Sequence, residues 1–169
     1  MGRIADPDRR GLLEGLLRLL KETFGEGLMS VVVFGSVARG DAKPSSDIDV
    51  LVVARNMPKS MMERMELMAK LMIKLEGTDA CRKLRERGVS TWVQLHPLWS
   101  EEAKLHRPIY LDMVDDAVIL LDRDGFIEAI LKGLKKRLGE LKAKRVYLRD
   151  GSWFWDLKPD IKRGEVVEI

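Results

Sequence analysis

Two short apolar segments set the fold that this chain can adopt. Residues 28–34 (LMSVVVF) and 47–53 (DIDVLVV) are rich in valine and show no helical periodicity. Runs of this length and composition are typical of strands buried on both faces of a sheet. Segments with helical spacing lie on either side of them, so helices and strands alternate along the chain. That alternation predicts an α/β domain with a small sheet flanked by helices.

Helical spacing, caps and turn residues predict the other elements. We expect a first helix from the Asp6-Pro7 cap to Gly25 and a turn with one helical turn at 35–40. A long helical stretch should run from Pro58 to about residue 87, with a break near Gly77. Further strands are expected at 89–95 and 117–121, and a last helix at 124–141. Pro97 is expected to end the third strand. A hairpin around Asp150-Gly151 follows. We therefore predict a domain over residues 1–141, and a C-terminal hairpin and tail over 142–169 packed on the same domain.

Composition narrows the class of protein. One cysteine, Cys81, excludes a disulfide framework within one chain. The N-terminus lacks the apolar stretch of a signal peptide, and no run is long enough to cross a bilayer, so a soluble cytoplasmic protein is expected. The net charge of +3 is too small to indicate nucleic-acid binding by itself. A single asparagine and a single glutamine resemble a thermophile's avoidance of labile amides.

Two carboxylates one residue apart are the strongest chemical signal. Asp47 and Asp49 open the second buried segment, and residues two apart on a strand point to the same face. Like charges held this close repel unless a positive charge lies between them. A divalent cation with oxygen ligands, Mg²⁺ or Mn²⁺, answers that requirement. The alternative is a pair of solvated carboxylates at the entrance to a strand.

A possible phosphate site lies just upstream. Gly35-Ser36 follows the first buried segment and begins a short helix. Glycine allows close approach of a ligand to the backbone, and free N–H groups at a helix start favour phosphate oxygens. The Ser36 hydroxyl adds a further hydrogen bond, and Arg39, one helical turn on, is placed to reach a triphosphate. The alternative for Arg39 is a surface cation that closes the short helix.

These residues resemble a known family. The stretches Val33-Phe34-Gly35-Ser36-Val37-Ala38-Arg39-Gly40 and Ser45-Ser46-Asp47-Ile48-Asp49-Val50-Leu51-Val52 look like the minimal nucleotidyltransferases of prokaryotes, in the DNA polymerase beta superfamily. The resemblance implies a small mixed sheet with flanking helices, bound Mg²⁺, and ATP or another nucleoside triphosphate as substrate. It also implies that Ser46 joins Gly35, Ser36 and Arg39 around the nucleotide. The family includes antitoxins that pair with small helical toxins and modify some of them with AMP.

One element of the family pattern is missing. Active members use a third carboxylate from a later strand, whereas residues 89–96 (VSTWVQLH) contain no acid. Gln94 shares a face with Ser90, Trp92 and His96, so it is expected at the third position. An amide oxygen can bind a metal but is neutral and a poor base. Glu101 or Glu102, on the next helix, are alternative sources of the acid.

Two functions therefore remain open. The first is a nucleotidyltransferase that moves a nucleoside monophosphate, AMP from ATP being favoured, to an acceptor hydroxyl. The second is a nucleotide-binding module with weakened catalysis that acts on a protein partner, as an antitoxin does. Residues 153–155 (WFW), interleaved with cations, suggest either RNA stacking or a hairpin whose rings pack on the domain or in a homodimer contact. The methionines at 61, 65, 68 and 72 are expected to fill the core; the alternative is a groove for a partner helix.

Overall fold

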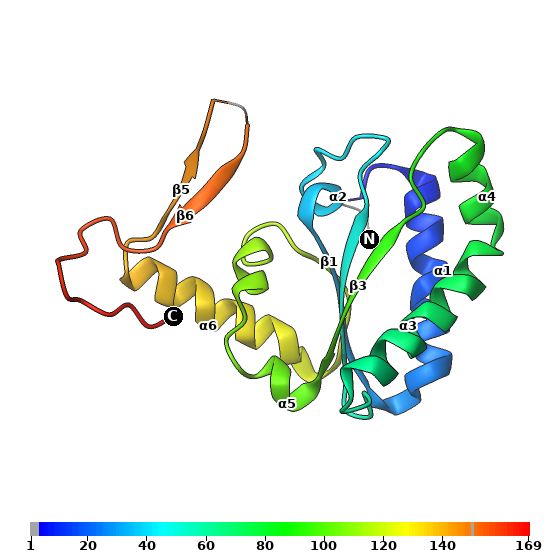
Figure 1. The fold of residues 1–169 in the computed structure, drawn as a ribbon, viewed down its shortest axis with the longest axis horizontal. Helices are drawn as coiled ribbons and strands as arrows, with labels where there is room; N and C mark the ends of the chain where they lie inside the picture. The colour runs from blue at the N-terminus through cyan, green and yellow to red at the C-terminus, as the bar shows by residue number, and fades with distance from the viewer. Residues whose placement is uncertain (1–3, 150) are drawn as a thin grey trace.

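The computed structural model describes residues 4–149 and 151–169 and shows a sheet between two layers of helices (Figure 1). Four strands form the sheet in the order β3-β2-β1-β4. They are β1 (Leu28–Phe34), β2 (Ile48–Ala54), β3 (Val93–Trp99) and β4 (Val118–Asp122). β1 pairs antiparallel with β2 and β4, while β2 and β3 run parallel. The mixed sheet expected from the sequence is confirmed.

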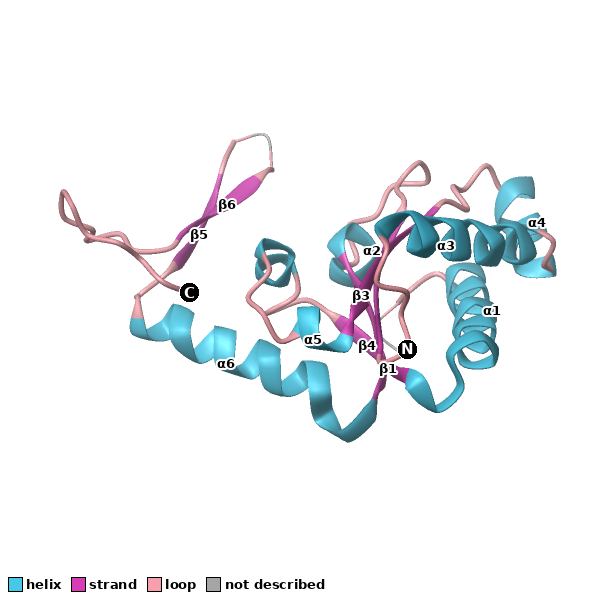
Figure 2. Ribbon diagram, turned by 60° about the horizontal axis from the view of Figure 1, so that its bottom comes forward, coloured by secondary structure: helices cyan, strands magenta, loops and turns pink. Residues whose placement is uncertain are grey.

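The helices divide between the two faces of the sheet. One face is covered by α1 (Pro7–Phe24), α3 (Met61–Glu76) and α4 (Asp79–Glu86). The other is covered by α5 (Ser100–Ala103), the 3-10 helix η2 (Pro108–Asp112) and α6 (Phe126–Glu140). The short helix α2 (Gly35–Arg39) follows β1 directly, and the 3-10 turns η1 (Gly25–Gly27) and η3 (Arg123–Gly125) precede β1 and α6. Figure 2 shows α6 running away from the sheet toward the C-terminal hairpin.

The alternation of side chains along β2 feeds two separate cores. Ile48, Val50 and Val52 pack with α1, α3 and α4, whereas Leu51 and Val53 pack with η2 and α6. All five side chains are buried, which is why this strand reads as a continuous apolar run. Asp49 belongs to the second set by the same alternation, so its side chain lies on the α6 face of the sheet.

Two expectations from the sequence need correction. The third strand runs from Val93 to Trp99 and passes through Pro97, although we expected 89–95 with Pro97 as its end. β3 is an edge strand, and a proline is tolerated there because no second neighbour needs its missing N–H. The methionine stripe fills the core only in part. Met68 is buried, but the exposed fractions of Met61 and Met65 are 60% and 54%.

The C-terminal hairpin consists of β5 (Lys144–Tyr147) and β6 (Trp153–Asp156). The Trp155 indole nitrogen donates a hydrogen bond to the Leu111 carbonyl at 3.1 Å, and the ring packs on the core beside α6. Arg145 lies against the rings of Trp153 and Trp155 and pairs with Asp116 at 2.6 Å. The hairpin is thus attached to the segment that contains η2.

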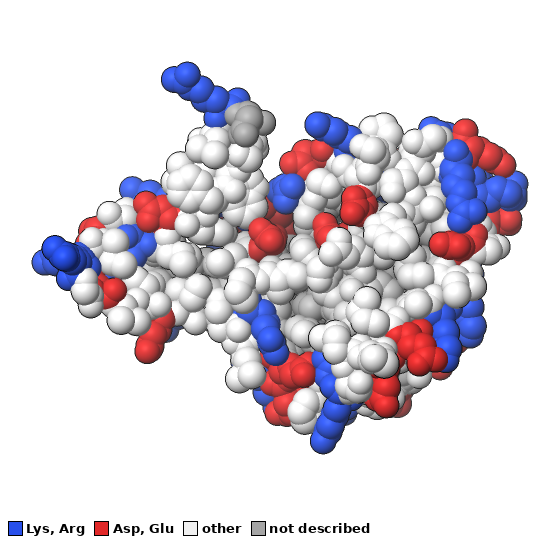
Figure 3. All heavy atoms as spheres, in the orientation of Figure 1, with Lys and Arg blue, Asp and Glu red and all other residues white. Residues whose placement is uncertain are grey.

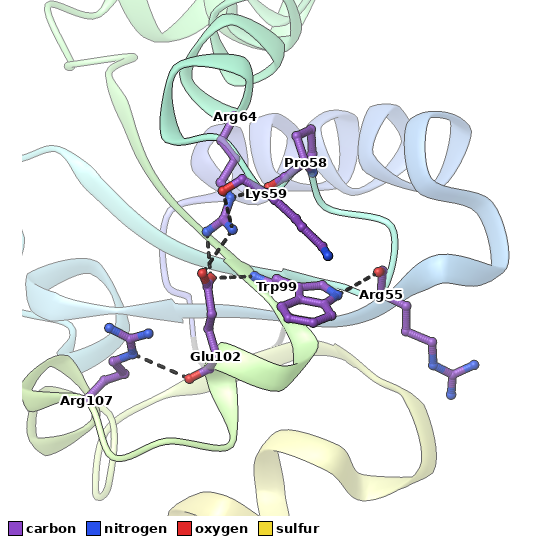
Figure 4. Close-up of polar contacts among 7 residues, drawn as sticks. All are labelled: Arg55, Pro58, Lys59, Arg64, Trp99, Glu102 and Arg107. Atoms are coloured by element: carbon purple, nitrogen blue, oxygen red, sulfur yellow. Dashed lines mark hydrogen bonds and ion pairs between the residues drawn. The ribbon is translucent and has the colours of Figure 1, made fainter.

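A buried ion pair joins α3 to α5, the short helix that follows β3. The Arg64 side chain is 2% exposed and donates to both carboxylate oxygens of Glu102, at 2.6 and 3.0 Å (Figure 4). Glu102 also accepts from the Trp99 backbone N–H at 3.1 Å, which fixes the start of α5. The hydrogen bond from Arg64 holds the pKa of Glu102 below its ordinary value.

No helix of the part described is long and apolar enough to cross a membrane.

We expect Glu102→Gln to lower the free energy of unfolding by about 2 kcal/mol, because it leaves the buried Arg64 charge without an anion. The loss is smaller than for a fully buried pair because Glu102 is partly exposed to solvent. The pKa of Glu102 is lowered on folding, so its contribution is present above the unfolded-state pKa and is lost as pH falls through the folded-state pKa. Urea unfolding should therefore separate wild type from variant at pH 7 and much less in strong acid. A difference that stays constant down to pH 2 would contradict this.

Candidate active site

The sheet register brings Asp49 against the turn that follows β1. Phe34 is the partner of Asp49 across the β1–β2 pair, so Gly35 comes directly beside that carboxylate. The Asp49 side chain is 29% exposed. Asp47 lies one residue before β2 and is exposed to solvent. Asp49 is therefore held by the sheet, whereas Asp47 sits on the loop that enters it.

Glycine is favoured at this place for two reasons. Its φ angle is +71°, in the left-handed region that favours glycine. A Cβ atom built on it would lie only 2.5 Å from Oδ2 of Asp49, far inside van der Waals contact. The missing side chain thus makes the space that the Asp49 carboxylate occupies. The sequence indicated glycine for approach of a ligand; the structure adds this contact within the chain.

The other residues expected around a nucleotide lie on α2 and the loop after it. Ser36 is in the first turn of α2 and Arg39 is the last residue of that helix. Arg39 pairs with Asp41 at 3.1 Å, and its side chain is partly exposed. The Ser46 hydroxyl accepts a hydrogen bond from the Lys43 backbone N–H, so it closes the loop that leads into β2.

The parallel pairing of β2 with β3 determines which residues of β3 lie beside Asp49. Gln94 is the register partner of Asp49, and His96 is the partner of Leu51. Gln94 is exposed to solvent. His96 is half-buried, with Nε2 3.7 Å from Oδ1 of Asp49 and its ring 5.3 Å from that of Phe34. That nitrogen is buried and has no hydrogen-bond partner among residues 4–149 and 151–169.

Neither glutamate of α5 stands ready to replace the missing acid. Glu102 is bound by Arg64 and caps α5. Glu101 is exposed and pairs with Lys104 at 2.8 Å. Moving Glu102 toward the sheet would break the buried pair and leave Arg64 without an anion.

A cleft of about 800 Å³ opens beside Asp49. One wall is formed by Gly35, Arg39 and His96, and the opposite wall by the hairpin. Figure 3 shows a deep notch between the hairpin and the body of the molecule, with acidic and basic side chains at its base. The described residues that line the cleft are Phe34, Gly35, Arg39, Asp41, Asp49, His96, Pro108, Ile109, Leu111, Asp112, Gly151, Ser152, Trp153, Phe154, Trp155 and Leu157.

Three parts of this cleft were missed by the sequence reading: Asp112, His96 beside Asp49, and the aromatic wall. Asp112 ends η2, and no motif marks it in the sequence. Burial raises the pKa of Asp112, while the charges of Arg39 and Arg145 lower it and that of Asp49 raises it further. Asp112 and Asp49 therefore interact electrostatically across the cleft. The WFW motif is visible in the sequence, but its place in the cleft with Asp49 depends on the path of α6.

The donor set suits a hard divalent cation. Asp49 occupies the space left at Gly35, and the buried Nε2 of His96 beside it makes no hydrogen bond within the part of the chain that the structure describes. Carboxylate oxygens are the ligands that Mg²⁺ prefers. Over residues 4–149 and 151–169, no three acidic, histidine or cysteine side chains are already grouped closely enough to hold a metal. Loading would therefore require the acids to draw together around the ion.

We expect Gly35→Ala to cost about 1–2 kcal/mol more than Gly40→Ala in the free energy of unfolding. Both glycines have positive φ, +71° and +87°, so both substitutions carry backbone strain. Only the Cβ at position 35 meets the Asp49 carboxylate, because nothing lies within 4 Å of a Cβ at position 40. Chemical denaturation of the two variants measures the difference. Equal losses would show that the contact with Asp49 is readily relieved.

Comparison with known proteins agrees with this geometry. A protein of Methanocaldococcus jannaschii, named as a candidate protein adenylyltransferase, is 27% identical over 135 residues, which cover 78% of this chain and 84% of that protein. A spectinomycin 9-adenylyltransferase of Staphylococcus aureus is 37% identical over 71 residues, 40% of this chain and 27% of the enzyme. That second similarity spans about a quarter of the relative.

Solved structures share the fold. A chain in the complex of a tri-AMPylated HEPN toxin with the MNT antitoxin of Shewanella oneidensis superimposes with a TM-score of 0.50 and 18% identity, covering 79% of this chain and 88% of that chain. At this identity the likeness concerns the fold. The family model described as a nucleotidyltransferase domain matches residues 13–162. With Gly35 and Asp49 brought together in one cleft, and with nine-tenths of its length matched, the chain belongs to the nucleotidyltransferase-domain family.

Proposed function

We propose that this chain transfers a nucleoside monophosphate, AMP from ATP in the first instance, to an acceptor hydroxyl in a reaction that depends on Mg²⁺ or Mn²⁺. The observation that carries the proposal is the half-buried Asp49 carboxylate, packed against Gly35 at one wall of a cleft with room for a nucleotide. Membership of the nucleotidyltransferase-domain family supports the reaction type. The M. jannaschii and S. aureus relatives, both named as adenylyltransferases, support AMP as the group transferred.

The roles of the residues follow from their places. Asp47 and Asp49 would hold the cation, which when bound supplies positive charge to the reacting phosphate and to the leaving pyrophosphate. Gly35, Ser36 and Ser46 lie on the turn and loop beside Asp49 and would contact the phosphates. Arg39 lines the cleft and would neutralise part of the triphosphate charge after exchanging its partner Asp41.

The bond changes are those of an in-line displacement. The acceptor oxygen forms a bond to the α-phosphorus, and the bond from that phosphorus to the bridging oxygen of pyrophosphate breaks. The acceptor's proton passes to a carboxylate of the site or to water, and pyrophosphate leaves with the electron pair of the broken bond. The open cleft and the exposed rings of the hairpin leave space for the nucleoside and for an acceptor as large as a protein side chain.

Asp49→Asn should lower the rate of AMP transfer by on the order of 10²–10³-fold, because it removes a charge aimed at the reacting centre. The measurement is transfer of label from α-labelled ATP in Mg²⁺ to protein and small-molecule acceptors, with release of pyrophosphate. Asp160→Asn, which changes an exposed tail residue, serves as the control. Parallel reactions with GTP, CTP and UTP give the base preference. Nucleotide binding without turnover on any acceptor would contradict the proposal.

A second candidate function is favoured by an apolar groove beside the site. Met61 and Met65 on α3 are more than half exposed and line a groove of about 400 Å³ with Leu95, Pro97, Leu98 and Ile109. Exposed methionines adapt to apolar partners. On this hypothesis the chain binds a small helical protein, as the MNT antitoxin is in complex with its HEPN toxin.

Met65→Lys separates the two functions. If protein binding alone matters, this substitution should abolish neutralisation of a co-expressed helical protein encoded beside the gene, while Asp49→Asn should leave neutralisation intact. The exposed Ile73 lies farther along the same helix, outside this groove, so Ile73→Lys is the matched control. If AMP transfer is the function, Asp49→Asn should abolish neutralisation.

A further inference from the structure

The cleft contains an acidic side chain that the proposed roles leave unused. Asp112 lines the cleft together with Asp49 and Arg39. It is half-buried, and its electrostatic interactions reach Arg39, Arg145 and Asp49. Within the described part of the chain, no hydrogen bond or ion pair satisfies its carboxylate. Asp41, the third acid of the lining, differs because it is exposed and already paired with Arg39.

Packing on both sides fixes the position of Asp112. Tyr110, two residues earlier, is fully buried, and its hydroxyl donates to the Ala103 carbonyl at 2.8 Å. The carbonyl of Leu111 accepts the Trp155 indole N–H from the hairpin. Met113, the next residue, is buried in the core beside α6. The backbone is thus held by its neighbours, without a hydrogen bond from the Asp112 carboxylate to any residue that the structure describes.

A carboxylate in this position is costly for the folded chain. Partial burial removes water from it, and the like charge of Asp49 in the same cleft adds repulsion. The charges of Arg39 and Arg145 offset part of this cost, but burial remains the largest effect. A divalent cation between the two carboxylates would offset both the burial and the repulsion. The other sources of a third acid are absent or engaged: β3 offers only the neutral Gln94, Glu102 is bound to Arg64, and Glu101 pairs on the surface.

We propose that Asp112 supplies the third carboxylate of the nucleotidyl-transfer site, from η2, in place of the acid that β3 lacks. The inference rests on the proposed function and adds a residue to it. The role requires the Asp112 side chain to turn toward Asp49 when a divalent cation enters the cleft. In this role the hydrogen bond from Trp155 to the Leu111 carbonyl also has a function, because it holds the backbone next to Asp112 in place.

The test uses Mn²⁺ as the probe on the full chain, without nucleotide. Electron paramagnetic resonance of free Mn²⁺ gives the affinity of wild type, Asp112→Asn, Asp49→Asn and Glu101→Gln. We expect Asp112→Asn and Asp49→Asn each to weaken Mn²⁺ binding at least 10-fold, on the scale of changes to metal-site residues. Glu101→Gln, which removes an acid on the surface of α5, should bind as wild type does. Asp112→Glu should retain part of the affinity.

Thermal melting distinguishes a metal-binding residue from a structural one. Asp112→Asn removes an unpaired, half-buried charge, so its melting temperature without metal should equal or exceed that of wild type. A fall in melting temperature with unchanged Mn²⁺ affinity would overturn the proposal, since Asp112 would then be structural. Loss of Mn²⁺ binding in Asp49→Asn alone would also overturn it while leaving the proposed function standing. Weakened binding in Asp112→Asn without AMP transfer on any acceptor would support Asp112 and refute the transfer reaction. A wild-type chain that binds no Mn²⁺ would overturn both.

Discussion

The contact between the backbone at Gly35 and the carboxylate of Asp49 is the constraint on which the site depends. It exists because β1 and β2 pair antiparallel with Phe34 opposite Asp49, so the turn after β1 meets the start of β2. A residue without a side chain suits this place, since a Cβ would lie 2.5 Å from the carboxylate oxygen and the φ angle at Gly35 is positive. The strand pair therefore sets the position of the acid, and the glycine leaves room for it. The turn that follows begins α2, which brings Ser36 and Arg39 to the same end of the sheet.

The unfavourable electrostatic interactions of the folded chain lie in the cleft beside Gly35 and Asp49. Most charged side chains of the surface are paired, often within one helix, and such pairs contribute little each. The buried Arg64–Glu102 pair is satisfied by its geometry. The cleft differs, because Asp49 and Asp112 share it with a His96 nitrogen that lies 3.7 Å from Asp49 and has no hydrogen-bond partner among the described residues. Such arrangements are more frequent at functional sites than elsewhere in proteins.

The C-terminal hairpin changes the site from an open sheet edge into a cleft with two walls. Trp155 attaches it beside η2, while Arg145 joins the rings of Trp153 and Trp155 to the acids that precede β4. The rings therefore serve packing, as one of the two interpretations of the sequence held, and they also face the carboxylates across the cleft. The family model reaches residue 162 and so includes this hairpin.

Local sequence was enough for the strands, the mixed sheet implied by the family resemblance, and the nearness of Gly35 to Asp49, because each depends on short-range pattern or on neighbouring strands. It misjudged the limits of β3, since the tolerance of Pro97 depends on that strand lying at the sheet edge. The expected place of Gln94 at the third position stays a prediction: Gln94 is the register partner of Asp49, but it is exposed and is not among the residues that line the cleft. Local sequence gave no sign of Asp112, of the hairpin wall, or of the engagement of Glu102 by Arg64. Those were decided only by tertiary packing, which brings together residues from η2, β6 and α3 that no sequence period relates.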